Sequence, residues 1–376
     1  MRGMNSTLHV GTRKGFFQIE RSGGKWRIAR ASFLGVPVPM LLHDPRDGTL
    51  FAAAEHGHFG TKFHASSDGG ATWEERACPT YPPKPGDVPD IIDPMRQKPV
   101  PWSLEKIWSL ETGSATEPGT LWCGTIPGGL FKSTDSGRSW AIVQSLWENP
   151  ARRKWFGGGA DWPGIHSICV DPRDPRHITI AVSCAGVWAT RDGGATWQVL
   201  GKGLVNDYMP PDQADSPDGQ DPHRVVACPV APDVMWMQHH CGIFVSADSG
   251  ANWKRIENVQ PSAFGFAVAV HPRDPKRAWF VPGMKDIQRH ACDGAVCVTE
   301  TRDGGASFAA HRAGLPQEHA YHIAYRHCLD IAGDGSTLAF GSTTGSLWAS
   351  TDSGANWERI SAELPPIYCV RFSGAA

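Results

Sequence analysis

Histidine is the residue type in this chain best suited to chemistry near neutral pH, and it is frequent: 16 of the 376 residues. Imidazole groups that meet at one point, with carboxylates beside them, bind transition metals or transfer protons. Several histidines stand at the ends of short apolar runs, where neighbouring strands would bring them together. We predict one divalent transition metal held by His166, His223, His239 and His240.

Two aspartates in glycine- and proline-rich segments complete the predicted catalytic set. Asp161 or Asp221 would assist His166 and His240 in acid–base chemistry, although the spacing selects no acid and base pair. No HExxH motif and no pair of CxxC motifs occurs, so the metal prediction depends on convergence in the fold. The alternative interpretation is that these histidines pack and hydrogen-bond the loops that carry them.

A further group of side chains is predicted to bind a small polar or glycan-like substrate. Cationic groups suit an anionic ligand, and tryptophans outside the repeated segments suit stacking against a sugar or, alternatively, anchoring of their loops. The set comprises His56, His58, Lys62, Lys106, Trp155, Arg289, His322 and Arg326.

The elements that must position these residues are repeated six times. Each copy follows the pattern [ST]-x-D-x-G-x-[TSN]-[WF], as in TRDGGATW from Thr190 to Trp197. The Asp side chain can accept a backbone hydrogen bond two residues on, and the shared glycine suits a positive φ. Short strand-like runs flank each copy. The pattern therefore predicts a hairpin turn with a structural role for its aspartate.

The aromatic residues that end the copies measure the length of the repeat. Their intervals lie between 47 residues (Trp26 to Trp73) and 67 residues (Trp73 to Trp140), which gives seven units, the first with a degenerate turn. In the fourth unit we predict strands over 165–170, 177–183, 186–190 and 196–200. Units of this length with several short strands indicate an all-β, seven-bladed propeller in a single domain, 1–376.

The first unit lacks its first strand, and the tail at 367–372 supplies one strand too many for the last unit. We therefore predict that the C-terminal strand completes the first blade and closes the ring. Inserted segments at 78–104, 146–164, 201–221 and 282–295 would converge with the histidines on the channel face, where a ligand would bind.

Composition limits the partners. With 36 Lys plus Arg against 38 Asp plus Glu, the formal charge is −2, which disfavours nucleic acid and anionic membranes as partners. The polar start of the chain and its scattered cysteines predict a cytoplasmic protein with reduced thiols. Only Cys292 and Cys297, in CDGAVC, are close enough in sequence to suggest a bond or a ligand pair.

The six turns resemble the BNR, or Asp-box, repeats of sialidases, sortilin-type receptors, xyloglucan-degrading propellers and a photosystem II assembly factor. The segments GGLF (128–131) and PGIHSI (163–168) are similar to those of bacterial exo-alpha-sialidase-like proteins. The resemblance covers nearly the whole chain and implies a sialidase-like propeller. The Arg-Ile-Pro element of sialidases does not occur, and none of the five tyrosines stands in an evident pair with a glutamate.

Two hypotheses follow, because the resembled family includes enzymes and non-enzymes. The first is a hydrolase or lyase, of the glycosyl-hydrolase kind and possessing a metal centre, with a small-molecule or glycan ligand on the channel face. The second is a non-catalytic propeller that binds or assembles a protein partner, which predicts an exposed apolar or charged patch and no metal.

Overall fold

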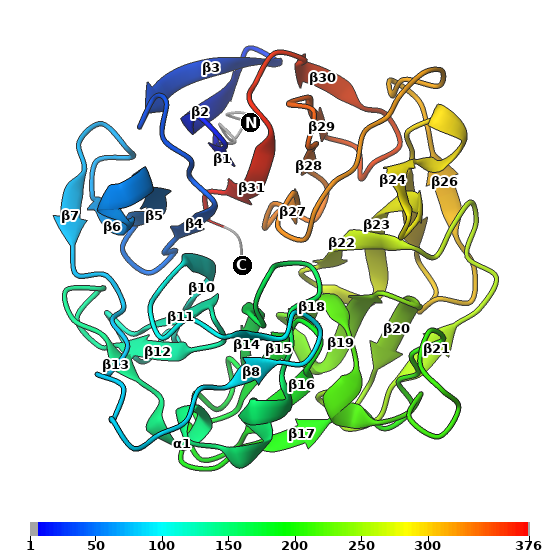
Figure 1. Cartoon of the computed structure of the whole chain (residues 1–376). Coiled ribbons are helices and arrows are strands. Elements are labelled where there is room, and N and C mark those ends of the chain that lie inside the picture. The colour runs from blue at the N-terminus through cyan, green and yellow to red at the C-terminus, as the bar shows by residue number, and fades with distance from the viewer. Residues whose placement is uncertain (1–6, 375–376) are drawn as a thin grey trace. The chain divides into compact units, whose positions relative to one another are not determined.

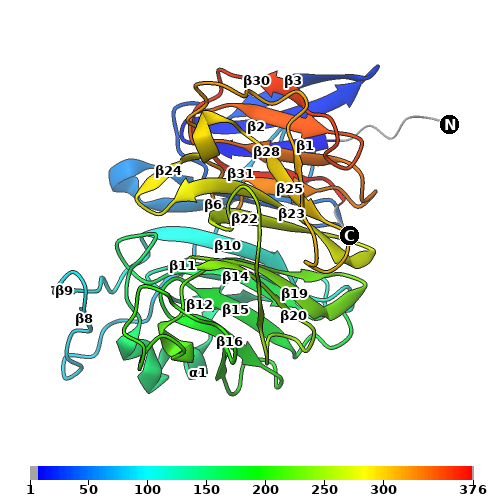
Figure 2. The same cartoon turned by 90° about the vertical axis from the view of Figure 1, so that its right-hand side faces the viewer.

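The computed structural model describes residues 7–374, and these form antiparallel strands with very little helix (Figures 1 and 2). The chain divides into two compact units. Unit 1 comprises Met1–Glu75, Cys228–Ala231 and Ile256–Ala376, and unit 2 comprises Arg76–Ala227 and Pro232–Arg255. The single domain expected over residues 1–376 stays a prediction.

Unit 1 contains four sheets, and the first of them joins the two ends of the chain. In hydrogen-bonding order they are β3 (Lys25–Ser32), β2 (Gly15–Ser22), β1 (Thr7–Thr12) and β31 (Ile367–Phe372); β4 (Met40–His43), β5 (Leu50–Glu55), β6 (Thr61–Ser66) and β7 (Glu74–Arg76); β22 (Gly265–His271), β23 (Asp274–Lys285), β25 (Val298–Thr301) and β26 (Ala309–His311), with β24 (Gln288–Ala291) beside β23; and β27 (Leu329–Ile331), β28 (Leu338–Gly341), β29 (Leu347–Ser350) and β30 (Glu358–Ser361).

Unit 2 contains three more sheets of the same design and a small ribbon. They are β10 (Lys106–Thr112), β11 (Leu121–Ile126), β12 (Leu130–Ser133) and β13 (Ala141–Ile142); β14 (Ile165–Val170), β15 (Ile178–Val182), β16 (Gly186–Thr190) and β17 (Gln198–Leu200); β18 (Pro222–Cys228), β19 (Ala231–His239), β20 (Gly242–Ser246) and β21 (Lys254–Ile256); and the ribbon of β8 (Ile92–Asp93) and β9 (Lys98–Pro99). Figure 2 shows this ribbon projecting from the other strands of unit 2.

These seven antiparallel sheets, each following the last along the chain, are the blades of a seven-bladed β-propeller. The predicted all-β fold is therefore confirmed. The strand bounds predicted for the fourth unit are close to the observed ones. β14 and β16 have the predicted bounds, β15 is shorter by one residue at each end, and β17 begins two residues later than predicted.

The C-terminal strand completes the first sheet, as predicted. β31 pairs antiparallel with β1, with Leu8 opposite Phe372 and Val10 opposite Val370. In Figure 1 the red end of the chain lies beside its blue beginning in this sheet. Leu8, Val10, Ile367 and Val370 are all fully buried, so an apolar core fixes this pairing.

The six repeated turns are hairpin turns, but their hydrogen bonds differ in detail from the expected ones. The Asp192 carboxylate accepts hydrogen bonds from the backbone N–H (2.9 Å) and hydroxyl (2.6 Å) of Thr196, four residues on. The Thr190 hydroxyl takes the role expected of the aspartate, because it accepts the N–H of Asp192 two residues on and also that of Gly194. The shared glycine has φ between 79° and 95° in all six copies.

Large apolar side chains fill the space between the strands of each unit. In unit 1, Trp279 and Trp348 are fully buried in one cluster, and in unit 2, Trp155 and Ile178 are fully buried in another. The short helical segments are α1 (Gln144–Trp147), η1 (Gly57–Phe59), η2 (Pro150–Lys154), η3 (Pro217–Gly219) and η4 (Cys292–Gly294). Within residues 7–374 no helix is long and apolar enough to cross a membrane. All ten cysteines are free thiols, so Cys292 and Cys297 form no disulfide.

Candidate metal centre

One aspartate and two histidines of unit 2 come together where an inserted segment enters the sheet β18–β21. Asp221 ends the insertion 201–221, His223 is the second residue of β18, and His240 follows β19 directly. Their ligand atoms all lie within 4.8 Å of one another. Asp221 and His223 are 5% and 3% exposed, and His240 is half-buried, so one side of the group is open to solvent.

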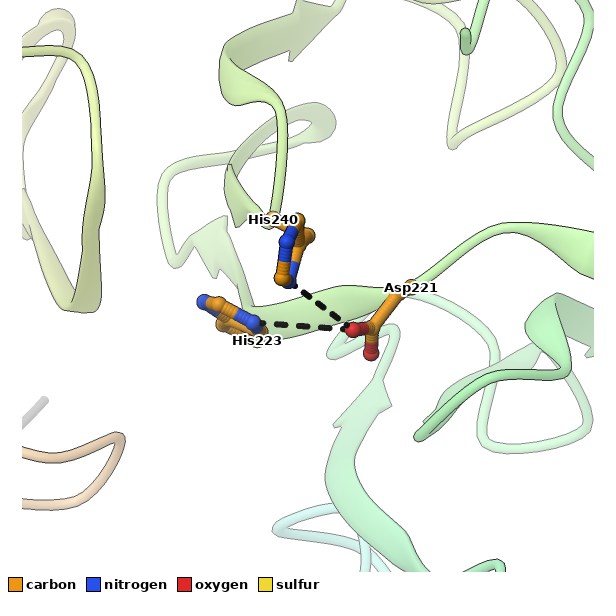
Figure 3. A group of neighbouring side chains, drawn as sticks. All are labelled: Asp221, His223 and His240. Carbon is orange, nitrogen blue, oxygen red and sulfur yellow. Dashed lines mark ion pairs between the residues drawn. The ribbon is translucent and has the colours of Figure 1, made fainter. Parts of the chain in front are cut away.

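A single carboxylate oxygen faces both imidazole rings (Figure 3). Asp221 Oδ2 lies 3.3 Å from His240 Nδ1 and 3.7 Å from His223 Nε2, and the two rings meet edge to face with centroids 5.3 Å apart. Two imidazole nitrogens and a carboxylate oxygen form a donor set typical of divalent transition metals, and three protein ligands leave a position for water or substrate. The residues present therefore fit the predicted ion.

Backbone hydrogen bonds from two neighbouring turns hold Asp221 in place. Its carbonyl oxygen accepts the N–H of His240 (3.0 Å), and its Oδ1 accepts the N–H of Cys184 (3.4 Å) from the turn between β15 and β16. Because Oδ1 is engaged in this way, Oδ2 is the oxygen directed at the imidazoles. This is the outer-shell support that orients a ligating carboxylate.

His239, predicted as a ligand, has a different role. The backbone N–H of Asp221 points at its Nε2 and that of Cys241 at its Nδ1, each at 3.1 Å, and the side chain is fully buried. Burial lowers the pKa of His239 to about 3, so the ring stays neutral. A neutral ring accepts at one nitrogen only; with Nε2 as that acceptor His239 holds the Asp221 N–H, and it does not join the group of three.

His166 and Asp161 also lie outside the group. His166 is fully buried, with Nδ1 3.0 Å from the hydroxyl of Ser167 and its ring edge-to-face with Trp108. Asp161 is exposed and forms an ion pair with Arg96 at 2.9 Å. The structure therefore brings together Asp221, His223 and His240 of the predicted catalytic and metal residues.

The predicted substrate-binding residues occupy several environments. In unit 2, Trp155 is fully buried against Trp188. Its ring offers no face to a ligand, so the prediction that it stacks against a substrate is corrected. Lys106 is half-buried at the start of β10. The other six belong to unit 1. Lys62 pairs with Glu75, Arg289 pairs with Asp286, Arg326 is buried over Phe266, His322 contacts Thr344, His56 precedes η1 and His58 is exposed within η1.

Sequence reasoning did not single out Tyr208, which lies beside the group. Its ring is 48% exposed and meets His240 edge to face, with centroids 5.0 Å apart. Tyr208 belongs to the same inserted segment as Asp221. The sequence did contain a signal for it, because Tyr208 is an aromatic residue in the insertion that ends at the predicted catalytic residue Asp221.

No family model and no curated protein sequence matches this chain. Solved structures with a similar fold include a periplasmic gluconolactonase of Pseudomonas aeruginosa, at 12% identity and a TM-score of 0.60, covering 99% of this chain and all of that one. An ancestral GH74 enzyme is similar at 15% identity and a TM-score of 0.58, over 86% of this chain. YCF48 of Cyanidioschyzon merolae is similar at 12% identity and a TM-score of 0.53, over 88% of this chain and 87% of its own.

These similar structures are propeller proteins, and at such identities the similarity concerns the fold. The chain spans 38% of the length of the GH74 enzyme, so it corresponds to a part of that protein. A gluconolactonase, a GH74 enzyme and YCF48 all occur among the similar structures, which leaves the activity to be argued from the site.

Proposed function

We propose that this protein is a metal-dependent hydrolase of small polar or glycan-like substrates, with its centre at Asp221, His223 and His240. The observation that carries the proposal is the convergence of these three side chains within 4.8 Å, two of them almost completely buried. Burying a carboxylate beside two imidazoles is costly unless a cation or a proton is shared among them. The wider assignment to sialidase-like BNR propellers, and a cytoplasmic location, belong to the same proposal.

The roles of the residues follow from their contacts. His223 Nε2, His240 Nδ1 and Asp221 Oδ2 would hold the ion, and His239 and the Cys184 N–H would keep Asp221 in its orientation. A divalent ion supplies Lewis acidity and lowers the pKa of a coordinated water toward neutrality. Tyr208, on the open side of His240, is placed to contact a substrate as it approaches.

The proposal predicts stoichiometric metal and an activity that depends on it. The protein purified without chelators should contain about one equivalent of a metal such as zinc, manganese, iron or nickel by elemental analysis. Gluconolactone and glycan-like compounds are the substrates to test first, since hydrolases share this fold. Changes to residues outside the ligand set typically lower metal affinity by about 10–100-fold. His223→Gln and His240→Gln each remove a direct ligand, so the loss of metal affinity should be larger, and the rate of hydrolysis should fall together with the metal content.

The matched control is His319→Asn, which removes an exposed histidine of unit 1 from a position with φ of 51° that asparagine adopts readily. It should keep both metal and activity. Hydrolysis by metal-free protein, or full metal content in the His223→Gln, His240→Gln double variant, would contradict the proposal.

The runner-up function is a non-catalytic propeller that binds a protein partner. Its specific support is a set of exposed apolar side chains in unit 1: Ile287 is 83% exposed in the turn between β23 and β24, with Met284 (38%) on the same hairpin. Ile287→Ser should then abolish capture of the partner from native extract, while His223→Gln should leave capture unchanged. A folded protein without metal that retains one partner would favour this function.

A further inference from the structure

Unit 2 contains a small pocket at the end of β14, the strand that also contains His166. Cys169 near the end of β14, His177 just before β15 and Met235 in β19 line it, together with Asp171, Thr179 and Ser249. Met235 is 2% exposed and His177 is 7% exposed, whereas Cys169 is half-buried. None of these residues belongs to the group around Asp221.

His177 presents a buried nitrogen that has no hydrogen-bond partner. Its Nδ1 lies 3.3 Å from Asp171 Oδ2, and Arg173 holds the same carboxylate through Nε (3.0 Å) and Nη2 (2.7 Å). The guanidinium keeps Asp171 ionised, so Nδ1–H donates to it and the lone pair of the ring lies on Nε2. Nε2 is buried and has no partner among the described residues. A histidine that donates one ring N–H to a carboxylate has its other nitrogen oriented for a metal.

Two of the residues that supply donor atoms to this pocket, His177 and Met235, differ from the residues at the equivalent positions of other blades. Thr49 and Thr337 occupy the place of His177 in other blades, because their carbonyl groups accept the corresponding hairpin N–H. Leu50 and Leu338 occupy the place of Met235, since each pairs with the first residue of a repeated turn, as Met235 pairs with Ser246. The fold of a blade therefore does not require His or Met at these positions.

The geometry points to a binding site for a soft monovalent metal ion, Cu(I), with Cys169 Sγ, Met235 Sδ and His177 Nε2 as its ligands. Thiolate and thioether sulfurs select Cu(I) over the harder divalent ions, and an imidazole is compatible with it. The Cys169 thiol donates to the carbonyl of Val225 at 3.8 Å, and burial raises its pKa to about 12, so it loses its proton only when its sulfur binds the ion. Val170, Ala227 and Pro232 add apolar lining, which favours a soft ion of low charge.

This site differs in chemistry from the centre at Asp221, which offers two nitrogens and an oxygen. The two sites therefore have different metal preferences and can be tested separately in the same protein. Failure of one assignment leaves the other standing, because they share no residue.

The test is Cu(I) binding by the whole protein under anaerobic conditions, in competition with a colorimetric Cu(I) chelator. We expect one tightly held equivalent whose X-ray absorption spectrum shows both sulfur and nitrogen neighbours. The variants use residues that other blades already carry: His177→Thr and Met235→Leu, with Cys169→Ser as a near-isosteric third. Each variant removes a direct ligand, so each should weaken Cu(I) binding by more than the about 10–100-fold that changes outside the ligand set cost.

Two controls remove a donor elsewhere in unit 2. Cys241→Ser replaces a half-buried thiol outside the pocket, and His223→Gln disables the centre at Asp221; both should bind Cu(I) like the unaltered protein. The inference is overturned if the folded, unaltered protein retains no Cu(I) against the chelator, if His177→Thr and Cys169→Ser bind as tightly as it does, or if the absorption spectrum shows sulfur neighbours alone.

Discussion

His9 shows how strongly burial affects a histidine in this protein. It lies in β1 at 2% exposure, with Nε2 2.7 Å from the hydroxyl of Ser373, just beyond β31. Burial, with a smaller contribution from His43, lowers the pKa of His9 from 6.5 to about 3. The unfolded chain therefore binds a proton between pH 6.5 and 3 that the folded chain does not bind. The contribution of neutral His9 to the free energy of unfolding is therefore fully present above pH 6.5 and is lost as the pH falls from 6.5 toward 3.

We expect the free energy of unfolding to fall by about 1.4 kcal/mol per pH unit below pH 6.5 on account of this one group. His9→Gln removes the titrating group, so its thermal midpoint should fall less steeply from about pH 7 to about pH 5 than that of the unaltered protein. The exposed histidine variant His319→Asn should keep the steeper dependence. Parallel curves for His9→Gln and the unaltered protein would contradict the assigned pKa.

The candidate site illustrates how far residue types alone can lead. Asp221, His223 and His240 were each predicted as site residues, but so were His166 and His239. His166 and His223 stand at the same place, near the start of the first strand of successive blades, so strand position could not separate them. What separates them is tertiary structure: a register shift between Ile165 and Ser167 in β14, and an insertion that ends at Asp221 beside β18.

At the scale of the element, the repeated turn is the most predictable part of the fold. Its third and fifth positions, aspartate and glycine, are set by local hydrogen bonds and by a positive φ, which are properties of neighbouring residues. The short segments inside the insertions, such as α1 and the β8–β9 ribbon, could not be predicted in the same way. They do not repeat, and their packing involves residues distant in sequence, as when Gly157 N–H donates to Asp93 at 2.9 Å.

Two adjacent glycines of one turn provide a test of this account. Gly304 and Gly305 both have positive φ, 75° and 91°. Serine already occupies the Gly304 position in other copies, as Ser136, Ser249 and Ser353, so Gly304→Ser should be nearly neutral. A side chain at Gly305 would meet the Ile256 side chain at 2.7 Å as well as an unfavourable φ. Gly305→Ala should cost at least about 1–2 kcal/mol in chemical denaturation.

Equal stability of the two glycine variants would show that the shared glycine is not required by conformation. The comparison is well matched, because both substitutions lie in the same exposed turn and add a single small side chain. A larger loss for Gly304→Ser than for Gly305→Ala would reverse the assignment of the two positions.

At the scale of the whole molecule, the number and spacing of the repeats predicted more of the fold than the amino-acid composition did. The number of blades and the pairing of the tail with the first blade both followed from repeat intervals and from one strand missing at the start. Repeats constrain a fold in this way because each unit needs a neighbour on which to bury its apolar face. The number of repeats carries no information on chemistry, since proteins as different as a gluconolactonase, a GH74 enzyme and YCF48 have a similar fold.

The C-terminal strand should be essential for cooperative unfolding. β31 buries Ile367, Val370 and Phe372 at 0%, 0% and 2% exposure, and burial of such side chains contributes about 1.5–3 kcal/mol each. Their sum is comparable to the whole stability of a typical domain, about 5–15 kcal/mol. Deleting residues 366–376 should therefore replace the sharp thermal transition, followed by circular dichroism, with a broad one at lower temperature.

Moving the strand should restore what deleting it removes. Phe372 lies opposite Leu8, and the N–H of Ser373 donates to the carbonyl of Thr7, so the end of β31 is adjacent to the start of β1. A permuted chain that begins with residues 366–374 and continues into β1 through a short linker gives the first blade the strand order of the others. The permuted chain should recover the cooperative transition because the same side chains are buried. An unchanged melting curve for the truncated protein would refute a structural role for the closing strand, and a permuted chain that melts like the truncated one would refute the pairing of β31 with β1 as its cause.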